Sequence, residues 1–229
     1  KTVILSLAGT ALLAGFVLIP SFGVKTLIIM VSAVLVLTAL VGLRRRLLFA
    51  SVAFMVVGVF AYGFSVAQPA GIYDRDSEYY RLIVEDNNGS RIILLDTQIA
   101  GGIILGSDEQ LYDYSKVARL SYAVVNSPSS ALVLGLGPGT EAKDFARSFP
   151  DGSVDAVEID PAVVAVAKEY FNFSEGNGTT VFVEDARMFL REEGRQYDII
   201  FMDAFNSMCA IPYHLATIET AELVKSRLA

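Results

Sequence analysis

Glycines and acidic residues recur in the second half of the chain where short apolar runs end. Gly135, Gly137 and Gly139 close the apolar run 131–136 and precede a predicted helix. Glycine lets the backbone approach a ligand closely, and the N-terminus of the following helix offers free N–H groups and a positive dipole end. Such a loop alone is also compatible with a simple turn.

An acidic residue ends the next apolar run, 154–159. Glu158 lies 23 residues after Gly135, about where an acid binds the ribose diol in nucleotide-binding βαβ units. A dinucleotide fingerprint requires Gly or Ala at the position of Thr140. The observed spacing, Gly-x-Gly-x-Gly, therefore favours an S-adenosyl compound over NAD.

Two further acids follow predicted strands. Asp185 and Ala186 come after the run 180–183, where a carboxylate can accept from an adenine amino group; the alternative is a helix N-cap. Asp203 follows the apolar run 197–202. A carboxylate in that place can orient an amine and accept its proton, so Asp203 is the candidate catalytic residue.

The remaining chemistry-bearing residue types are scarce. His214 is the only histidine and lies just after the Asp203 loop, where it either contacts the substrate or serves as a hydrogen-bonded structural residue. Cys209 is the only cysteine and is read as a small buried apolar side chain. One histidine with these neighbours does not make a zinc site, so no metal is expected.

The order of predicted elements positions these residues. Strands at 131–136, 154–159, 180–183 and 197–202 alternate with helices at 140–148, 161–170, from 186 and at 216–228. This alternation predicts an α/β fold, a doubly wound parallel sheet whose strand ends bind the ligand. Before it, runs at 80–84 and 91–95 around Asn88-Gly89 predict a β hairpin, followed by a helix from Ser107-Asp108 to Val125.

The first 68 residues differ in composition from the rest. They contain no Asp or Glu and five basic residues, whereas the remainder carries 13 Lys or Arg against 25 Asp or Glu. Three apolar stretches, 2–20, 24–43 and 47–67, each approach the roughly 20 residues that span a bilayer. The expected domains are transmembrane helices at 1–68, a β hairpin with a linking helix at 69–126, and a cofactor domain at 127–229 that is truncated at its C-terminus.

Taken together, these pieces resemble the polyamine aminopropyltransferase (spermidine synthase) family, in particular its membrane-fused members. The resemblance covers residues 73 to about 219 and rests on a set of short motifs: Asp76 to Arg81, Leu95-Asp96, Asp108 to Tyr114, the glycine loop, Val157 to Asp160, Glu184 to Ala186 and Asp203 to Phe205. It implies a small N-terminal β domain, a Rossmann-like domain similar to S-adenosylmethionine-dependent methyltransferases, and aminopropyl transfer from decarboxylated S-adenosylmethionine to an amine such as putrescine. Glu158 would bind the ribose and Asp185 the adenine, while Asp203 would act on the attacking amine.

The substrate half departs from the family pattern. Pro138 stands where the family has an acid that contacts the aminopropyl chain, and Asn206 replaces a second acid that holds the diamine. Gln98 is slightly displaced from an expected glutamine. The expected substrate-binding residues are Tyr79, Gln98, Asn206 and His214. Two alternatives stay open: an S-adenosylmethionine-dependent methyltransferase and a non-catalytic membrane-bound sensor.

The composition and the family resemblance also predict binding partners and a cellular location. A small-molecule amine and membrane lipid are expected, a homodimer is left open, and the acidic soluble part excludes nucleic acid, which requires a basic face. The cofactor implies a cytoplasmic catalytic domain on a multi-pass protein of the cell membrane. Arg44-Arg45-Arg46 conflicts with this topology, because basic loops normally stay inside.

Overall fold

The structure is a computed structural model that describes residues 26–33, 71–107, 109–204 and 210–229. Contacts divide the chain into two units, the second being Gly71–Tyr73 with Tyr80–Ala229. Residues 26–33 of the first unit are helical. Within the described ranges, no helix combines the length and apolar character needed to cross a bilayer. The three expected spans lie outside these ranges, except for that helical piece of the second.

The N-terminal β region is a four-stranded sheet of β1 (Tyr73–Asp76), β2 (Arg81–Asn87), β3 (Ser90–Leu95) and β4 (Gln98–Ile104), in that order. The predicted hairpin is confirmed: β2 and β3 pair antiparallel from Asn87↔Ser90 to Leu82↔Leu95. Asn88 and Gly89 both have positive φ, +50° and +80°. Those angles suit a tight two-residue turn whose twist matches the strands. Sequence reasoning missed β1 and β4.

The second sheet is parallel and has the order β7-β6-β5-β8. Its strands are β5 (Ser130–Leu134), β6 (Ser153–Glu158), β7 (Thr179–Val183) and β8 (Ile199–Met202). The chain moves outward from β5 through β6 to β7 and then returns to the other side of β5 as β8. The predicted parallel sheet is therefore confirmed, with its reversal of strand order beside β5, where ligands of such sheets bind.

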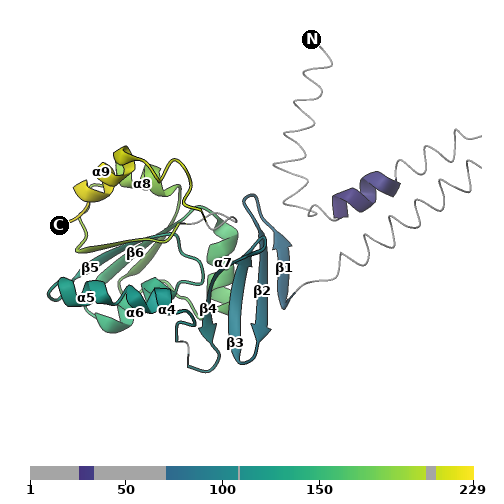
Figure 1. Ribbon diagram of the computed structural model, residues 1–229, viewed down its shortest axis with the longest axis horizontal. Coiled ribbons are helices and arrows are strands. Elements are labelled where there is room, and N and C mark those ends of the chain that lie inside the picture. The colour runs from purple at the N-terminus through teal and green to yellow at the C-terminus, as the bar shows by residue number, and fades with distance from the viewer. Residues whose placement is uncertain (1–25, 34–70, 108, 205–209) are drawn as a thin grey trace, which may run out of the picture. The chain divides into compact units, whose positions relative to one another are not determined.

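Helices cover both faces of the parallel sheet, as Figure 1 shows. They are α6 (Thr140–Ser148), α7 (Pro161–Tyr170), α8 (Ala186–Glu192) and α9 (Ile218–Ser226). Ala142 and Phe145 of α6 pack with Val164 of α7 in one core cluster, and the apolar side chains of α8 form a second cluster with Leu132 and Leu134. A third cluster places Val163 of α7 against the antiparallel sheet, so α7 joins the two sheets.

The expected single helix from Ser107-Asp108 to Val125 is wrong. The structure has two short helices, α4 (Asp113–Val117) and α5 (Leu120–Val124). At the break, backbone N–H groups bond three residues back, as in Arg119 N to Lys116 O at 3.1 Å. Arg119 also donates to Asp144 of α6, Nε to Oδ2 at 2.9 Å. The turn between α4 and α5 thus carries Arg119, which contacts α6. The helical spacing of the sequence does not reveal this contact.

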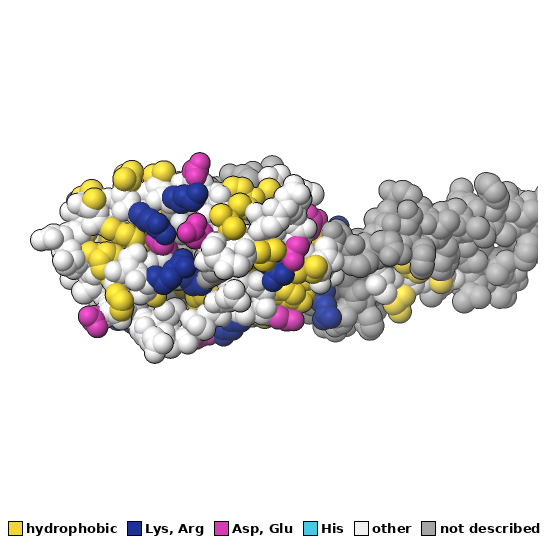
Figure 2. All heavy atoms as spheres, turned by 90° about the horizontal axis from the view of Figure 1, so that it is seen from below, with side chains coloured by type: hydrophobic (Ala, Val, Ile, Leu, Met, Phe, Trp, Pro, Cys, Tyr) yellow, Lys and Arg dark blue, Asp and Glu magenta, His cyan; other side chains and the backbone are white. Residues whose placement is uncertain are grey.

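Charged side chains of both signs mix on the underside of the molecule. Figure 2 shows Lys and Arg gathered there with Asp and Glu between them. Ion pairs on the helices include Lys116 with Asp113 at 3.1 Å, in addition to Arg119 with Asp144. This face therefore carries charges of both signs rather than the single-sign field that binds phosphate backbones.

Candidate functional site

The glycine loop lies between β5 and α6 and is held from two sides. Gly135 N donates to Val157 O of β6 at 2.8 Å, and Asp203 N donates to Leu134 O at 2.9 Å. Gly135 has φ +96°, and a Cβ there would lie 2.5 Å from Asp203 O. Only glycine fits both this backbone conformation and this close approach. The loop and Asp203 are therefore fixed against each other.

We expect Gly135→Ala to destabilise the protein by about 2–4 kcal/mol, because the methyl group meets backbone and the left-handed conformation is strained. Gly176→Ala is a matched control, since Gly176 has φ +101° but a Cβ there would meet nothing within 4 Å. The control should cost only the conformational part, about 1–2 kcal/mol. Urea unfolding of both variants checks this, and equal losses would refute the close-approach explanation.

Glu158 ends β6 and is almost fully buried, 8% exposed. Its Oε2 accepts from Leu136 N at 3.0 Å, and its Oε1 accepts from Asp160 N at 3.1 Å. Burial raises the pKa of this carboxyl, opposed by the N–H groups of Asp160, Leu136 and Gly137. The side chain thus links the glycine loop to the start of α7. A carboxylate has about four acceptor positions, so these N–H groups leave at least one for a hydroxyl.

Asp185 is the N-cap of α8, and Ala186 is the buried first residue of that helix. Asp185 Oδ1 accepts from Arg187 N and Met188 N, both at 3.0 Å. Its Oδ2 lies 3.1 Å from His214 Nε2. The helix-cap alternative is therefore present in the structure. One lone pair of Oδ2 remains for a ligand donor, so capping and adenine binding are compatible.

His214 contacts protein on both its side chain and its backbone. Besides the imidazole contact with Asp185, His214 O accepts from Arg187 Nη1 at 3.0 Å and from Thr220 Oγ1 at 2.8 Å. These bonds join the segment before α9 to the start of α8. The structure brings His214 to the predicted adenine acid, a pairing that spacing did not suggest.

Asp203 directly follows β8, at the same sheet edge as Glu158. Its side chain is half-buried. Burial raises the pKa of Asp203 to about 7, and the charge of Glu141 adds to that rise. A carboxyl group with this pKa exchanges a proton readily at neutral pH, as a general base must.

Glu141 was missed by sequence reasoning. It lies in the first turn of α6 and is 6% exposed. The signal that could have found it is its spacing of four from the buried Phe145, which places both on the interior face of the helix. Packing alone does not explain a carboxylate on the interior face of a helix that follows a glycine loop.

The raised pKa of Asp203 predicts a pH-dependent stability. The unfolded group has a pKa near 3.8, so the native state is stabilised below that value, and the contribution is lost as pH rises through about 7. Asp203→Asn removes this loss. We expect the variant to match the wild type at about pH 3, below the unfolded pKa, and to exceed its free energy of unfolding at pH 8 by about 1–3 kcal/mol, allowing for solvent screening. Urea unfolding at both pH values tests the sign.

Of the other predicted substrate-binding residues, Tyr79 lies between β1 and β2, and Gln98 lies in β4. Tyr79 is 44% exposed, and its backbone N–H donates to Ser77 Oγ at 3.0 Å. Gln98 is the first residue of β4 and is half-buried. The part of β4 that reaches the glycine loop is Ala100 and Gly101: a Cβ on Gly101 would lie 2.7 Å from the Pro138 ring, and a Cβ on Gly137 would lie 3.4 Å from Ala100 O. Asn206 lies outside the described residues.

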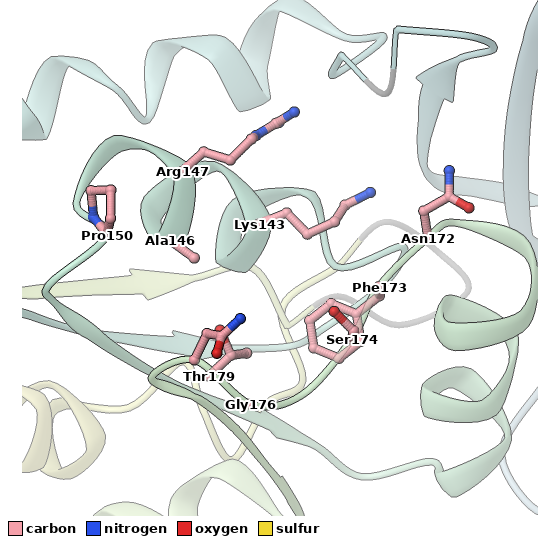
Figure 3. Close-up of a pocket in the computed structure, with 10 residues that line it drawn as sticks. Lys143, Ala146, Arg147, Pro150, Asn172, Phe173, Ser174, Gly176 and Thr179 are labelled. Atoms are coloured by element: carbon pink, nitrogen blue, oxygen red, sulfur yellow. The ribbon is translucent and has the colours of Figure 1, made fainter.

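A cavity of about 610 Å³ lies away from Asp203, between α6 and the segment after α7. Figure 3 shows Lys143 and Arg147 of α6 on one side and Phe173 and Thr179 on the other. The Phe173 ring separates it from the loop, since a Cβ on Gly139 would lie 2.5 Å from that ring. The acidic residues at the strand ends therefore do not line this cavity. In the described ranges, no group of three or more His, Cys, Asp or Glu is arranged to hold a metal.

Comparisons with known proteins show which proteins this chain is similar to. A family model described as "Methyltransferase domain" matches residues 131–225. A crystal structure of a probable spermidine synthase from Corynebacterium glutamicum superposes with a TM-score of 0.59 at 22% identity, covering 71% of this chain and 61% of that one. The fold is thus that of Rossmann-like methyltransferases and spermidine synthases, with an N-terminal antiparallel sheet.

Curated relatives carry the family name. Polyamine aminopropyltransferase of Vibrio vulnificus is 30% identical over 176 residues, which is 71% of this chain and 58% of that protein. A probable polyamine aminopropyl transferase of Bifidobacterium longum is 30% identical over 169 residues, 72% of this chain and 37% of the relative. The chain is a homologue of the polyamine aminopropyltransferases, as its motifs predicted, and it spans little more than half of the Vibrio protein.

Proposed function

We propose that this chain belongs to an enzyme that transfers an aminopropyl group from decarboxylated S-adenosylmethionine to an amine acceptor such as putrescine. The observation that carries the proposal is Asp203, a carboxylate fixed beside the glycine loop with a pKa of about 7. The relatives named polyamine aminopropyltransferase support the same reaction. Their alignments cover 71% and 72% of this chain.

The residues at the strand ends fit an S-adenosyl group. Gly135, Gly137 and Gly139 leave three positions of the loop without a side chain, directly ahead of the N-terminus of α6. Glu158 already accepts two backbone N–H groups and has lone pairs left for the ribose hydroxyls. Asp185, next to Ala186, has one remaining acceptor position for the adenine amino group.

The chain's own part in the reaction is to bind, orient and deprotonate. Decarboxylated S-adenosylmethionine supplies a sulfonium-activated carbon, to which the amine nitrogen bonds as the carbon–sulfur bond breaks and its electron pair stays on sulfur. Asp203 accepts the proton that the amine loses, and its fixed backbone keeps the carboxylate in line with the loop. Glu158 would hold the ribose end of the cofactor.

A methyltransferase is the second candidate, because the methyltransferase family model matches residues 131–225 and because Pro138 replaces the family's acid in the loop. The two reactions use different forms of the cofactor. Calorimetry with S-adenosylmethionine, its decarboxylated form and methylthioadenosine separates them. Tighter binding of the decarboxylated form supports aminopropyl transfer, whereas preference for S-adenosylmethionine supports methyl transfer.

We further propose that the apolar N-terminal region, residues 1–68, anchors the enzyme in the cell membrane as helices, with the catalytic domain in the cytoplasm. Its support is composition, since these residues include no acid. The 229-residue chain should stay in the membrane fraction after alkaline carbonate washing and require detergent for release. A chain beginning at Ala70 should not require it. Release of the 229-residue chain by carbonate alone would refute the proposal that residues 1–68 anchor it in the membrane.

A further inference from the structure

Glu141 is a buried carboxylate with little to neutralise it. It is 6% exposed, and within the described part of the chain its one hydrogen-bond donor is Thr140 Oγ1, at 2.9 Å from Oε2. Its place in the first turn of α6 favours a negative charge through the helix dipole. An acid that is deeply buried normally has a cationic partner. Asp144, also on α6, shows this, because it is paired with Arg119.

The glycine loop itself presents no charge to a ligand. Pro138, at its tip, packs against Gly101 of β4, where a Cβ would lie 2.7 Å from the proline ring. This contact turns the Pro138 side chain toward the antiparallel sheet. The first acidic residue after the loop in the sequence is Glu141.

Glu141 and Asp203 lie on the two sides of that loop. Asp203 follows β8 and contacts Gly135, the first residue of the loop, while Glu141 follows Gly139, the last. The charge of Glu141 acts on Asp203. On the other neighbouring elements, Glu158 ends β6 beyond β5, Asp185 and His214 pair with each other at α8, and Tyr122 of α5 faces Asp144.

Two carboxylates whose charges act on one another are stable together when they share a proton or a cation. An ammonium group has three donors and a compact charge, so it can bond to both at once. We infer that Glu141 and Asp203 together bind the ammonium group of the acceptor, with Glu141 as the residue that selects a cationic amine over neutral acceptors. This inference rests on the proposed function and deepens it by assigning the acceptor subsite.

The test compares Glu141→Gln with the wild type in the 229-residue protein. The variant keeps the shape and loses the charge. We expect the KM for putrescine to rise at least about tenfold, since a charge-assisted contact is lost. We also expect the pH midpoint of kcat/KM to move to lower pH, because Asp203 no longer faces a like charge. Binding of methylthioadenosine should stay within about twofold. Glu141→Asp should recover part of the putrescine KM.

Glu169→Gln, an exposed acid on α7, is the control and should change none of these values. If Glu141→Gln leaves both the putrescine KM and the pH midpoint unchanged, the inference is overturned although the transferase proposal stands. If the wild type transfers no aminopropyl group, calorimetric binding of putrescine with methylthioadenosine present decides. Binding that weakens tenfold in Glu141→Gln supports the subsite, and absence of binding to the wild type overturns it.

Discussion

Asp203→Asn should lower turnover by about 10²–10⁴ while leaving the affinity for methylthioadenosine nearly unchanged. The amide keeps the shape of the side chain and its backbone bond to Leu134, but it cannot accept the proton of the attacking amine. The Asp203→Asn change also removes the negative charge that would balance the ammonium group of the acceptor. In the proposed reaction Asp203 contacts the acceptor and not the nucleoside, so we expect cofactor binding to be spared. Single-turnover rates and calorimetry on the same preparations measure the two effects.

The matched control for this variant is Asp151→Asn, an exposed acid between α6 and β6 that should leave turnover unchanged. Wild-type turnover by a folded Asp203→Asn protein would make Asp203 a structural residue. Because its pKa is about 7, kcat/KM of the wild type should also rise with pH through that value as the carboxylate forms. This rise should disappear in the variant's residual activity.

Glu158→Gln should weaken binding of the S-adenosyl cofactor by about ten- to a hundred-fold, the cost of a lost charge-assisted hydrogen bond to a ribose hydroxyl. Glutamine is preferable to alanine here. Alanine would leave the buried N–H groups of Leu136 and Asp160 without their acceptor and would disturb the loop itself. The amide retains one oxygen for these donors.

Calorimetric affinity and thermal unfolding separate the two roles of Glu158. Glu192→Gln, an exposed acid at the end of α8, is the comparison variant and should bind the cofactor like the wild type. The ribose assignment is wrong if a folded Glu158→Gln protein binds with wild-type affinity. A loss of stability without a loss of affinity would mean that Glu158 only supports the loop.

Much of the fold could be predicted from short segments whose residues determine the local backbone structure. Asn88-Gly89 adopts the two positive φ angles that a tight hairpin requires, and Asp160-Pro161 starts α7 with a side-chain bond to Ala162 N at 2.8 Å. The helix at 140–148 begins and ends where the sequence predicts. In each case the residues that set the structure lie within a few positions of it.

The features that sequence reasoning missed depend on contacts between distant segments. The division of the 107–125 region into α4 and α5 accompanies the bond from Arg119 to Asp144, which lies 25 residues away. His214 reaches Asp185 across 29 residues. The same holds for the electrostatic effect of Glu141 on Asp203. Periodicity describes one segment at a time, so it cannot show which side chains the fold brings together.

Product analysis tests the central claim most directly. The full 229-residue protein is incubated with putrescine and either decarboxylated S-adenosylmethionine or S-adenosylmethionine, and the products are identified by mass spectrometry. We expect methylthioadenosine and spermidine in equal amounts from the decarboxylated cofactor, and no transfer from S-adenosylmethionine. Methylated product together with S-adenosylhomocysteine, and no aminopropylated amine, would contradict it.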